Sequence, residues 1–152
     1  MTIDHIPTPS GKLYLTAVRD VAHDPVAALA SVGATTMVCL AERGELESRH
    51  PAYLEWIRAQ GTDRAIWFPI QNYGARDADY VAPVVSRIVD RLAGGVIMHC
   101  YYGQGRAGTM AAAVLMAMGL DQAEAVRTVA AHRFGAGPAS GRQWDLLEAL
   151  AR

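Results

Sequence analysis

The sequence predicts an α/β fold in which a central, mostly parallel sheet lies between two layers of helices, a three-layer arrangement with a helical C-terminal third. Short apolar segments alternate with helical patterns as far as residue 99, and the chain from residue 107 onward repeats the helical pattern alone. Such alternation is typical of parallel strands joined by helices. The 152 residues, of which 51% are hydrophobic, suffice for one full core. We therefore expect residues 1–152 to form a single domain.

The expected strands are short runs rich in apolar residues. They are residues 13–15, 35–40, 65–68 and 96–99. The run TTMVCL is the clearest of them, because β-branched and apolar side chains without alternation are typical of a strand buried on both faces. The sheet is expected to be complete at His99.

The expected helices begin at capping residues and end mostly at glycines. They cover residues 24–33, 51–60, 77 or 79 to 93, 107–118, 122–132 and 140–151. Asp24 with Pro25 is a typical helix start, and Asp121 with Glu124 resembles a capping box. Residues 69–76 are expected to form a loop.

Charge and cysteine content exclude several classes of protein. The chain has 14 Lys and Arg against 15 Asp and Glu, a balance that argues against a nucleic-acid partner. Cys39 and Cys100 are too few for a disulfide framework or a cysteine-rich metal site. The longest apolar run, residues 107–120, is shorter than the ~20 residues that span a bilayer, and residues 1–5 do not resemble a signal peptide. We expect a cytoplasmic protein with reduced thiols, no membrane partner, no metal and no cofactor.

The residues that follow the last expected strand carry the strongest functional signal. They read HCYYGQGRAGT, residues 99–109, and lead from a buried strand into an apolar helix. Glycines allow such a loop to turn backbone N–H groups inward, and the helix N-terminus adds positive potential. Arg106 offers a planar fork for two phosphate oxygens, and the same field favours the nucleophilic thiolate of Cys100. The expected phosphate-binding residues are Tyr101, Tyr102, Gly103, Gln104, Gly105 and Arg106.

This segment has two other interpretations. Gly103, Gly105 and Gly108 match the G-x-G-x-x-G fingerprint of dinucleotide-binding proteins, but that fingerprint needs a following strand that ends in an acidic residue. Here a second helix follows instead. The other alternative is a structural cysteine in a glycine-rich turn.

The chain resembles the cysteine-dependent protein tyrosine and dual-specificity phosphatases. Within them it is most similar to the small kinase-inhibitor-associated dual-specificity phosphatases and their bacterial relatives. Besides the string at residues 99–109, the resemblance rests on a turn at residues 43–46 (RGEL), a general-acid loop at residues 68–75 (FPIQNYGA) and a terminal segment at residues 141–144 (GRQW). It extends over about residues 11–150.

The resemblance implies a two-step reaction. Cys100 attacks phosphorus while an Asp protonates the leaving oxygen, and water then hydrolyses the phosphocysteine. Two positions depart from the family's pattern: Asn72 stands where the family has its Asp, and Ala107 stands where a hydroxyl assists the departing thiolate. Asp77 or Asp79 could replace the acid, or the step could lack a carboxylic acid. Either Asp could instead cap the following helix.

Four further residues have both a functional and a structural interpretation. His99 braces the loop through hydrogen bonds, as the resemblance implies, or is a core histidine. Gln143 orients the attacking water or is an exposed polar residue at a helix start. Thr109 matches the family, but its helical phase differs from that of the missing hydroxyl. Cys39 is a resolving thiol for the oxidised catalytic cysteine or a small core residue.

The sequence therefore predicts a phosphoprotein phosphatase that works through a phosphocysteine on Cys100. Its partner is a phosphorylated protein or a small phosphomonoester. Two alternatives stay open: a catalytically impaired phosphate-binding protein, favoured by Asn72 and Ala107, and a phosphatase of non-protein phosphomonoesters. Relatives of the last kind usually place Lys in the loop, where this chain has Tyr101 and Tyr102.

Overall fold

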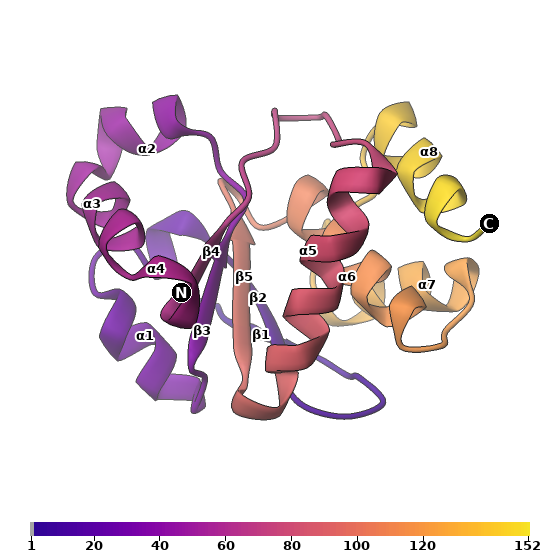
Figure 1. Ribbon diagram of the computed structural model, residues 1–152, viewed down its shortest axis with the longest axis horizontal. Coiled ribbons are helices and arrows are strands. Elements are labelled where there is room, and N and C mark those ends of the chain that lie inside the picture. Colours follow the sequence, from indigo (N-terminus) through magenta and orange to yellow (C-terminus); the bar gives the residue numbers. More distant parts are fainter. Residues whose placement is uncertain (1) are drawn as a thin grey trace.

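A five-stranded sheet runs through the middle of the molecule with helices on both faces (Figure 1). The computed structural model describes residues 2–152. The strands are β1 (Asp4–Ile6), β2 (Leu13–Ala17), β3 (Thr36–Cys39), β4 (Ala65–Trp67) and β5 (Val96–Cys100). Their order is β1-β2-β5-β3-β4, and all neighbours are parallel except β1 and β2. The expected α/β fold with a mostly parallel sheet is confirmed.

The helices form the two outer layers. They are α1 (Pro25–Val32), α2 (Arg43–Arg49), α3 (Pro51–Ala59), α4 (Gly61–Arg64), α5 (Ala78–Arg91), α6 (Gly105–Ala117), α7 (Gln122–His132) and α8 (Gly141–Leu150). Short 3-10 turns cover Val18–Asp20 and Leu92–Gly94. In Figure 1, α1–α4 lie on one side of the sheet and α5–α8 on the other, so the expected helical C-terminal third covers a single face.

Side chains along each strand alternate between two cores, because successive residues of a strand point to opposite faces. In β3, Val38 packs into the core beneath α5–α8, whereas Met37 and Cys39 pack into the core beneath α1–α3. In β5, Cys100 belongs to the first core and Ile97 to the second. The two cysteines therefore lie on opposite faces of the sheet.

Three elements differ from the sequence prediction. The short strand β1 was not expected, because three residues show no usable periodicity. A helix, α2, replaces the turn expected at residues 43–46, and the Glu42 N–H donates to Glu45 Oε1 at 2.9 Å in its first turn. Gly61 begins the short helix α4 rather than ending the preceding one.

The boundaries around the glycine-rich segment also shift. β5 continues one residue further than expected, to Cys100, and α6 begins two residues earlier than expected, at Gly105. Because β5 lies between β2 and β3, Cys100 ends a central strand. The carboxyl edge of a parallel sheet is where ligands bind in such folds.

Candidate active site

The chain turns tightly between the end of β5 and the first turn of α6, over residues 101–106, which we call the anion loop. Gly103 has a φ of +74°, and a Cβ there would overlap the carbonyl oxygen of Thr16, so glycine is needed at this position. Within residues 2–152, none of the backbone N–H groups of residues 102–106 donates a hydrogen bond. Unpaired N–H groups gathered in one loop are suitable donors for an anion.

Arg133, at the end of α7, holds the anion loop from behind. Its Nε donates to the carbonyl of Gly103 at 2.7 Å and its Nη2 to the carbonyl of Tyr102 at 3.0 Å. Its Nη1 forms an ion pair with Asp4 Oδ2 of β1 at 2.9 Å. In a trans peptide the C=O and the following N–H point in opposite directions. The N–H groups of Gly103 and Gln104 are therefore turned away from Arg133.

Arg106 is held by the half-buried carboxylate of Glu45. Its Nη1 and Nη2 donate to the two oxygens of Glu45 at 2.7 and 2.9 Å, and Nη1 also donates to the carbonyl of Ile70 at 2.7 Å. Burial has the largest single effect and raises the pKa of the Glu45 carboxyl. The hydrogen bonds from Arg106 and from the backbone of Glu42, together with the positive charge of Arg106, outweigh burial, and the pKa lies below its usual value. Of the five guanidinium N–H groups, these bonds occupy three. The Nε–H and one Nη2–H, which lie side by side on one edge, stay available for two oxygens.

Cys100 lies in a small pocket of about 170 Å³. The thiol is buried and free, with 3% of the residue exposed. The described residues that line the pocket are Asn72, Tyr73, Cys100, Tyr102, Gln104, Gly105, Arg106, Gly135, Ala139 and Gln143. The structure therefore brings the expected sulfur, guanidinium and loop backbone together in one pocket.

No carboxylic acid is among the described residues that line this pocket. Asn72 lies at its wall, as the resemblance implies. Asp77 is exposed and begins α5, and it lines a separate depression together with Arg142 and Asp145. Asp79 is exposed in the first turn of the same helix. The structure thus does not bring the candidate acid Asp77 to Cys100, because the chain turns outward where α5 starts.

His99 is fully buried beneath the anion loop. Its Nδ1 lies 2.9 Å from the carbonyl oxygen of Cys100, and its Nε2 is hydrogen-bonded to the hydroxyl of Tyr53 from α3. A carbonyl only accepts, so Nδ1 carries the proton and Nε2 accepts from the hydroxyl. Burial lowers the pKa of His99 to about 4. The imidazole is therefore neutral and has both nitrogens engaged, an arrangement suited to bracing the loop.

Gln143 and Thr109 link the pocket wall to α6 and α8. Gln143 is 1% exposed, unlike the exposed residue that one interpretation expected. Its Oε1 accepts from the N–H of Ala139 at 2.7 Å, and its Nε2 donates to the carbonyl of Gly74 at 3.2 Å. Thr109 Oγ1 lies 2.7 Å from the carbonyl of Gly105 and 3.2 Å from Gln143 Oε1. These bonds fix the loop that carries Asn72.

Cys39 is separated from the pocket by the sheet itself. It is fully buried in the core beneath α1–α3, whereas Cys100 belongs to the opposite core. Burial raises the pKa of the Cys39 thiol to about 12, and only a thiolate attacks an oxidised sulfur. The structure favours the core-residue interpretation over the resolving-thiol interpretation.

Three residues of this site were not predicted from the sequence. Arg133, Tyr53 and Glu45 lie far from residues 99–106 in the chain, and each contacts the site only through the tertiary fold. A lone Arg after a helix and a Tyr on an amphipathic helix carry no local signal of such contacts.

A mostly parallel sheet with an anion loop and a buried cysteine at the end of its central strand is the architecture of a cysteine-dependent phosphatase. The family model described as "PTP-SAK: Swiss Army Knife protein, DSP-PTPase phosphatase domain" matches residues 12–141. The chain belongs to this family, and it is a hydrolase of phosphorylated substrates, a phosphatase of the dual-specificity type. No curated protein sequence is significantly similar to the chain.

Several solved structures share the fold. A kinase associated phosphatase with serine in place of its catalytic-site cysteine is 22% identical, with a TM-score of 0.81 and coverage of 99% of this chain and 96% of that chain. Tk-PTP in its active form is 23% identical, with a TM-score of 0.73 and coverage of 99% and 98%. Human DUSP28 is 22% identical, with a TM-score of 0.74 and coverage of 99% and 94%.

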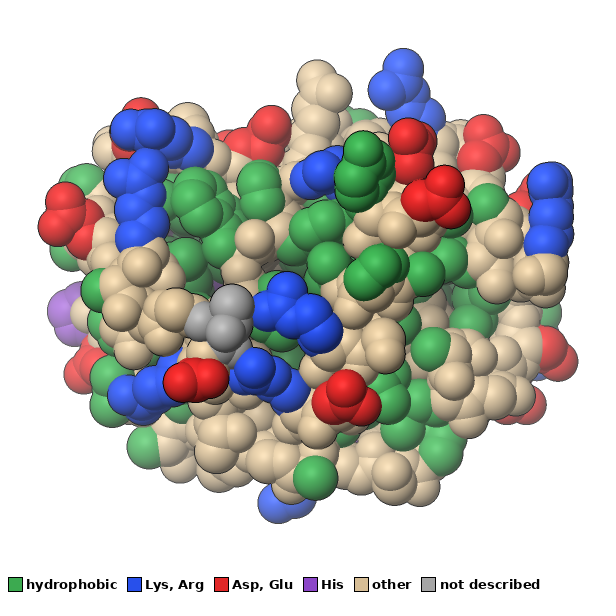
Figure 2. All heavy atoms as spheres, in the orientation of Figure 1, with side chains coloured by type: hydrophobic (Ala, Val, Ile, Leu, Met, Phe, Trp, Pro, Cys, Tyr) green, Lys and Arg blue, Asp and Glu red, His purple; other side chains and the backbone are tan. Residues whose placement is uncertain are grey.

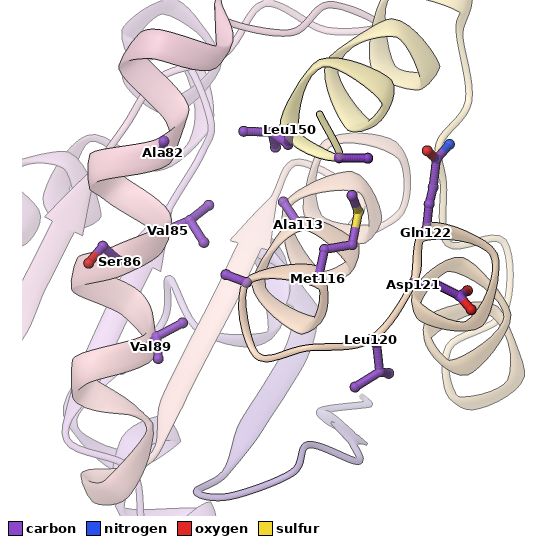
Figure 3. Close-up of a pocket in the computed structure, with 12 residues that line it drawn as sticks. Ala82, Val85, Ser86, Val89, Ala113, Met116, Leu120, Asp121, Gln122 and Leu150 are labelled. Carbon is purple, nitrogen blue, oxygen red and sulfur yellow. The ribbon is translucent and has the colours of Figure 1, made fainter.

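Other features of the molecule do not contribute to this site. An apolar depression of about 520 Å³ lies between α5, α6 and the C-terminal end of α8, and Figure 3 shows Val85, Val89 and Met116 around it. Within the described residues, no three His, Cys, Asp or Glu side chains gather as metal ligands. No helix in residues 2–152 is long and apolar enough to cross a bilayer.

Proposed function

We propose that this phosphatase hydrolyses phosphomonoesters through a phosphocysteine on Cys100. The observation that carries the proposal is that Cys100 and Arg106 line one small pocket, and that two N–H groups of Arg106 have no hydrogen-bond partner among the described residues. At about 170 Å³, the pocket is smaller than the ~300–1,000 Å³ of sites for whole drug-sized ligands. It suits a phosphate group whose organic part stays outside.

The first step transfers the phosphoryl group to sulfur. Cys100 Sγ bonds to phosphorus, and the bond from phosphorus to the ester oxygen breaks with its electron pair on that oxygen. The anion loop and Arg106 donate to the non-bridging oxygens, where charge must be held during transfer. In the second step water attacks phosphorus, the S–P bond breaks, and inorganic phosphate leaves with the thiolate restored.

The leaving oxygen receives its proton from water, because none of the described pocket residues is a carboxylic acid. Without a general acid, the rate depends on how well the leaving group carries negative charge. A phenol has a pKa of about 10 and is a far better leaving group than an alkyl alcohol. We therefore propose aryl phosphates, of which phosphotyrosine is the protein-borne form, as the preferred substrates.

The reaction also needs a free thiol. Both cysteines are free, and a nucleophilic thiol persists in reducing compartments. We propose that the enzyme acts in such a compartment, of which the cytoplasm is the usual one.

The test compares p-nitrophenyl phosphate, a phosphotyrosyl peptide and a phosphoseryl peptide of the same sequence. The wild type should hydrolyse the first two at least about 100-fold faster than the third, since general-acid catalysis contributes about 10²–10⁴-fold. Cys100→Ser should abolish turnover yet bind the phosphopeptide, because the hydroxyl is barely ionised. Cys39→Ala is the matched control and should keep activity.

Two outcomes would contradict the proposal. Binding without turnover by the wild type would identify a phosphate-binding protein rather than an enzyme. Equal turnover of the aryl and alkyl phosphates would show that a general acid acts after all. Asn72→Asp should raise turnover of the phosphoseryl peptide more than that of p-nitrophenyl phosphate, because it restores an acid at the pocket wall.

A further inference from the structure

A second and larger hollow adjoins the pocket of Cys100. Its volume is about 570 Å³, and the residues that line it are Val18, Arg19, Glu45, Ser48, Arg49, His50, Asn72, Tyr101 and Tyr102. We call it the basic groove. Asn72 and Tyr102 line both hollows. A substrate whose phosphate lies at Cys100 therefore has its next atoms beside the groove.

The groove carries unbalanced positive charge. Arg19 and Arg49 are exposed, and among residues 2–152 neither has a carboxylate partner within 4 Å. The one carboxylate in the lining, Glu45, is occupied by Arg106. Over the face that Figure 2 presents, positive and negative side chains are interspersed. Two guanidinium groups without partners, beside a site for a phosphate, are suited to another anion.

The wall between the two hollows is neutral. An Asp at position 72 would place a negative charge on both the pocket and the groove, whereas the amide of Asn72 places none. Tyr102 is 65% exposed and contacts Tyr101 edge to face at 5.0 Å between ring centroids. The shared wall therefore consists of an amide and a phenol ring, which allow an anionic group to lie close to the bound phosphate.

We propose that the basic groove binds a second anionic group of the substrate, so that the enzyme favours phosphomonoesters that carry two anionic groups. Arg19 and Arg49 are its specificity-determining residues. This inference rests on the proposed function, because it assumes that the phosphate to be hydrolysed lies at Cys100. The second group is an acidic or phosphorylated side chain of a phosphotyrosyl peptide, or the second phosphate of a small bisphosphate.

Binding to Cys100→Ser tests the groove without requiring turnover. Fluorescence anisotropy would measure Kd for two phosphotyrosyl peptides that differ only in Glu or Gln beside the phosphotyrosine. The Glu peptide should bind about 5- to 50-fold more tightly, since one exposed ion pair gives up to ~5-fold and two with hydrogen bonds give more. Added Arg19→Gln and Arg49→Gln should reduce this ratio to below 2. Arg127→Gln, an exposed Arg of α7 outside the groove, is the matched control and should keep it.

A small-molecule arm distinguishes the two sources of the second anion. An aryl monophosphate and the matched aryl bisphosphate compete with the labelled Gln peptide on the same variants. Tighter binding of the bisphosphate that depends on Arg19 and Arg49 supports the groove, and whichever pair shows the larger ratio identifies the source. Ratios near 1 in both arms, or an equal loss in Arg127→Gln, overturn the groove. Turnover of p-nitrophenyl phosphate by the wild type reports separately on the proposed function.

Discussion

Replacing Arg133 by methionine removes the guanidinium that holds the anion loop from behind. The side chain is 8% exposed and makes two hydrogen bonds to the loop, at 2.7 Å to Gly103 and 3.0 Å to Tyr102. Methionine fills a similar volume but donates nothing. The two carbonyls then lose the donor that keeps the following N–H groups turned toward the opposite side.

The expected effect on catalysis is that of losing one hydrogen bond that water does not replace. A bond from a charged donor contributes about 1.5–3 kcal/mol. Tyr102 is exposed, so water can take over at its carbonyl, whereas Gly103 is buried and keeps an unpaired acceptor. Asp4 also loses its ion pair with Arg133. Because the Asp4 side chain is 33% exposed, the loss of this ion pair adds less than about 1 kcal/mol. We expect kcat/KM to fall roughly 10–150-fold.

The assay measures kcat/KM on p-nitrophenyl phosphate and the affinity for vanadate. Both should fall in Arg133→Met, and circular dichroism should show a folded protein. Asp4→Asn keeps the donors to the loop and should change kcat/KM less than about 5-fold. A folded Arg133→Met with wild-type kcat/KM and vanadate affinity would contradict this role of Arg133, as would an equal loss in the exposed α7 control Arg127→Met.

Three further outcomes follow from the site. Ala107→Ser should shrink a pre-steady-state burst of p-nitrophenolate and raise kcat while leaving kcat/KM nearly constant, and a wild type without a burst would contradict this. Glu45→Gln should lower kcat/KM roughly 10–150-fold. The pKa of Glu45 is depressed in the folded protein, so the variant should have a lower free energy of unfolding than the wild type at neutral pH. This difference should disappear as the pH falls through that pKa. Tyr53→Phe leaves His99 Nε2 unpaired and should cost about 1–3 kcal/mol in urea unfolding. The Nδ1–H tautomer should persist in ¹⁵N spectra, because the carbonyl of Cys100 still accepts from it; an unchanged free energy of unfolding would contradict the assigned bond.

The expected effect of Ala107→Ser requires that the hydroxyl of Thr109 does not already assist the departing thiolate. A hydroxyl has one proton, and that of Thr109 is engaged with the carbonyl of Gly105 or with Gln143. It is therefore not free to assist the departing thiolate. The helical phase that the sequence indicated agrees with this placement.

The central strands could be predicted because their signal is local. The run at β3 is apolar on both faces, and β5 ends at a loop whose glycines indicate a turn. The positions of Cys100 and Arg106 relative to that turn follow from chain order alone. The four parallel strands of the sheet, and the position of Cys100 at the end of β5, therefore follow from the sequence.

The supporting residues could not be predicted because their partners are distant in the chain. Arg133 contacts Gly103 across 30 residues, and Arg106 contacts Glu45 across 61. The helix α2 was not predicted because its residues, RGELESR, have little apolar periodicity. The outward position of Asp77 depends on where α5 starts relative to the sheet, which no local pattern encodes.

The helix that follows the anion loop is buried from Arg106 to Leu115 without interruption, whereas Tyr73, Tyr102 and Arg49 at the rim are exposed. A large-to-small substitution in such a helix costs about 2–5 kcal/mol, while an exposed substitution usually costs less than about 0.5 kcal/mol. The machinery that holds phosphate is therefore tied to the stability of the whole molecule, and the rim that selects the rest of the substrate is not. Proteins that evolve from this chain can therefore change their substrate through substitutions at the rim. The residues that bind phosphate are retained because the protein needs them to fold.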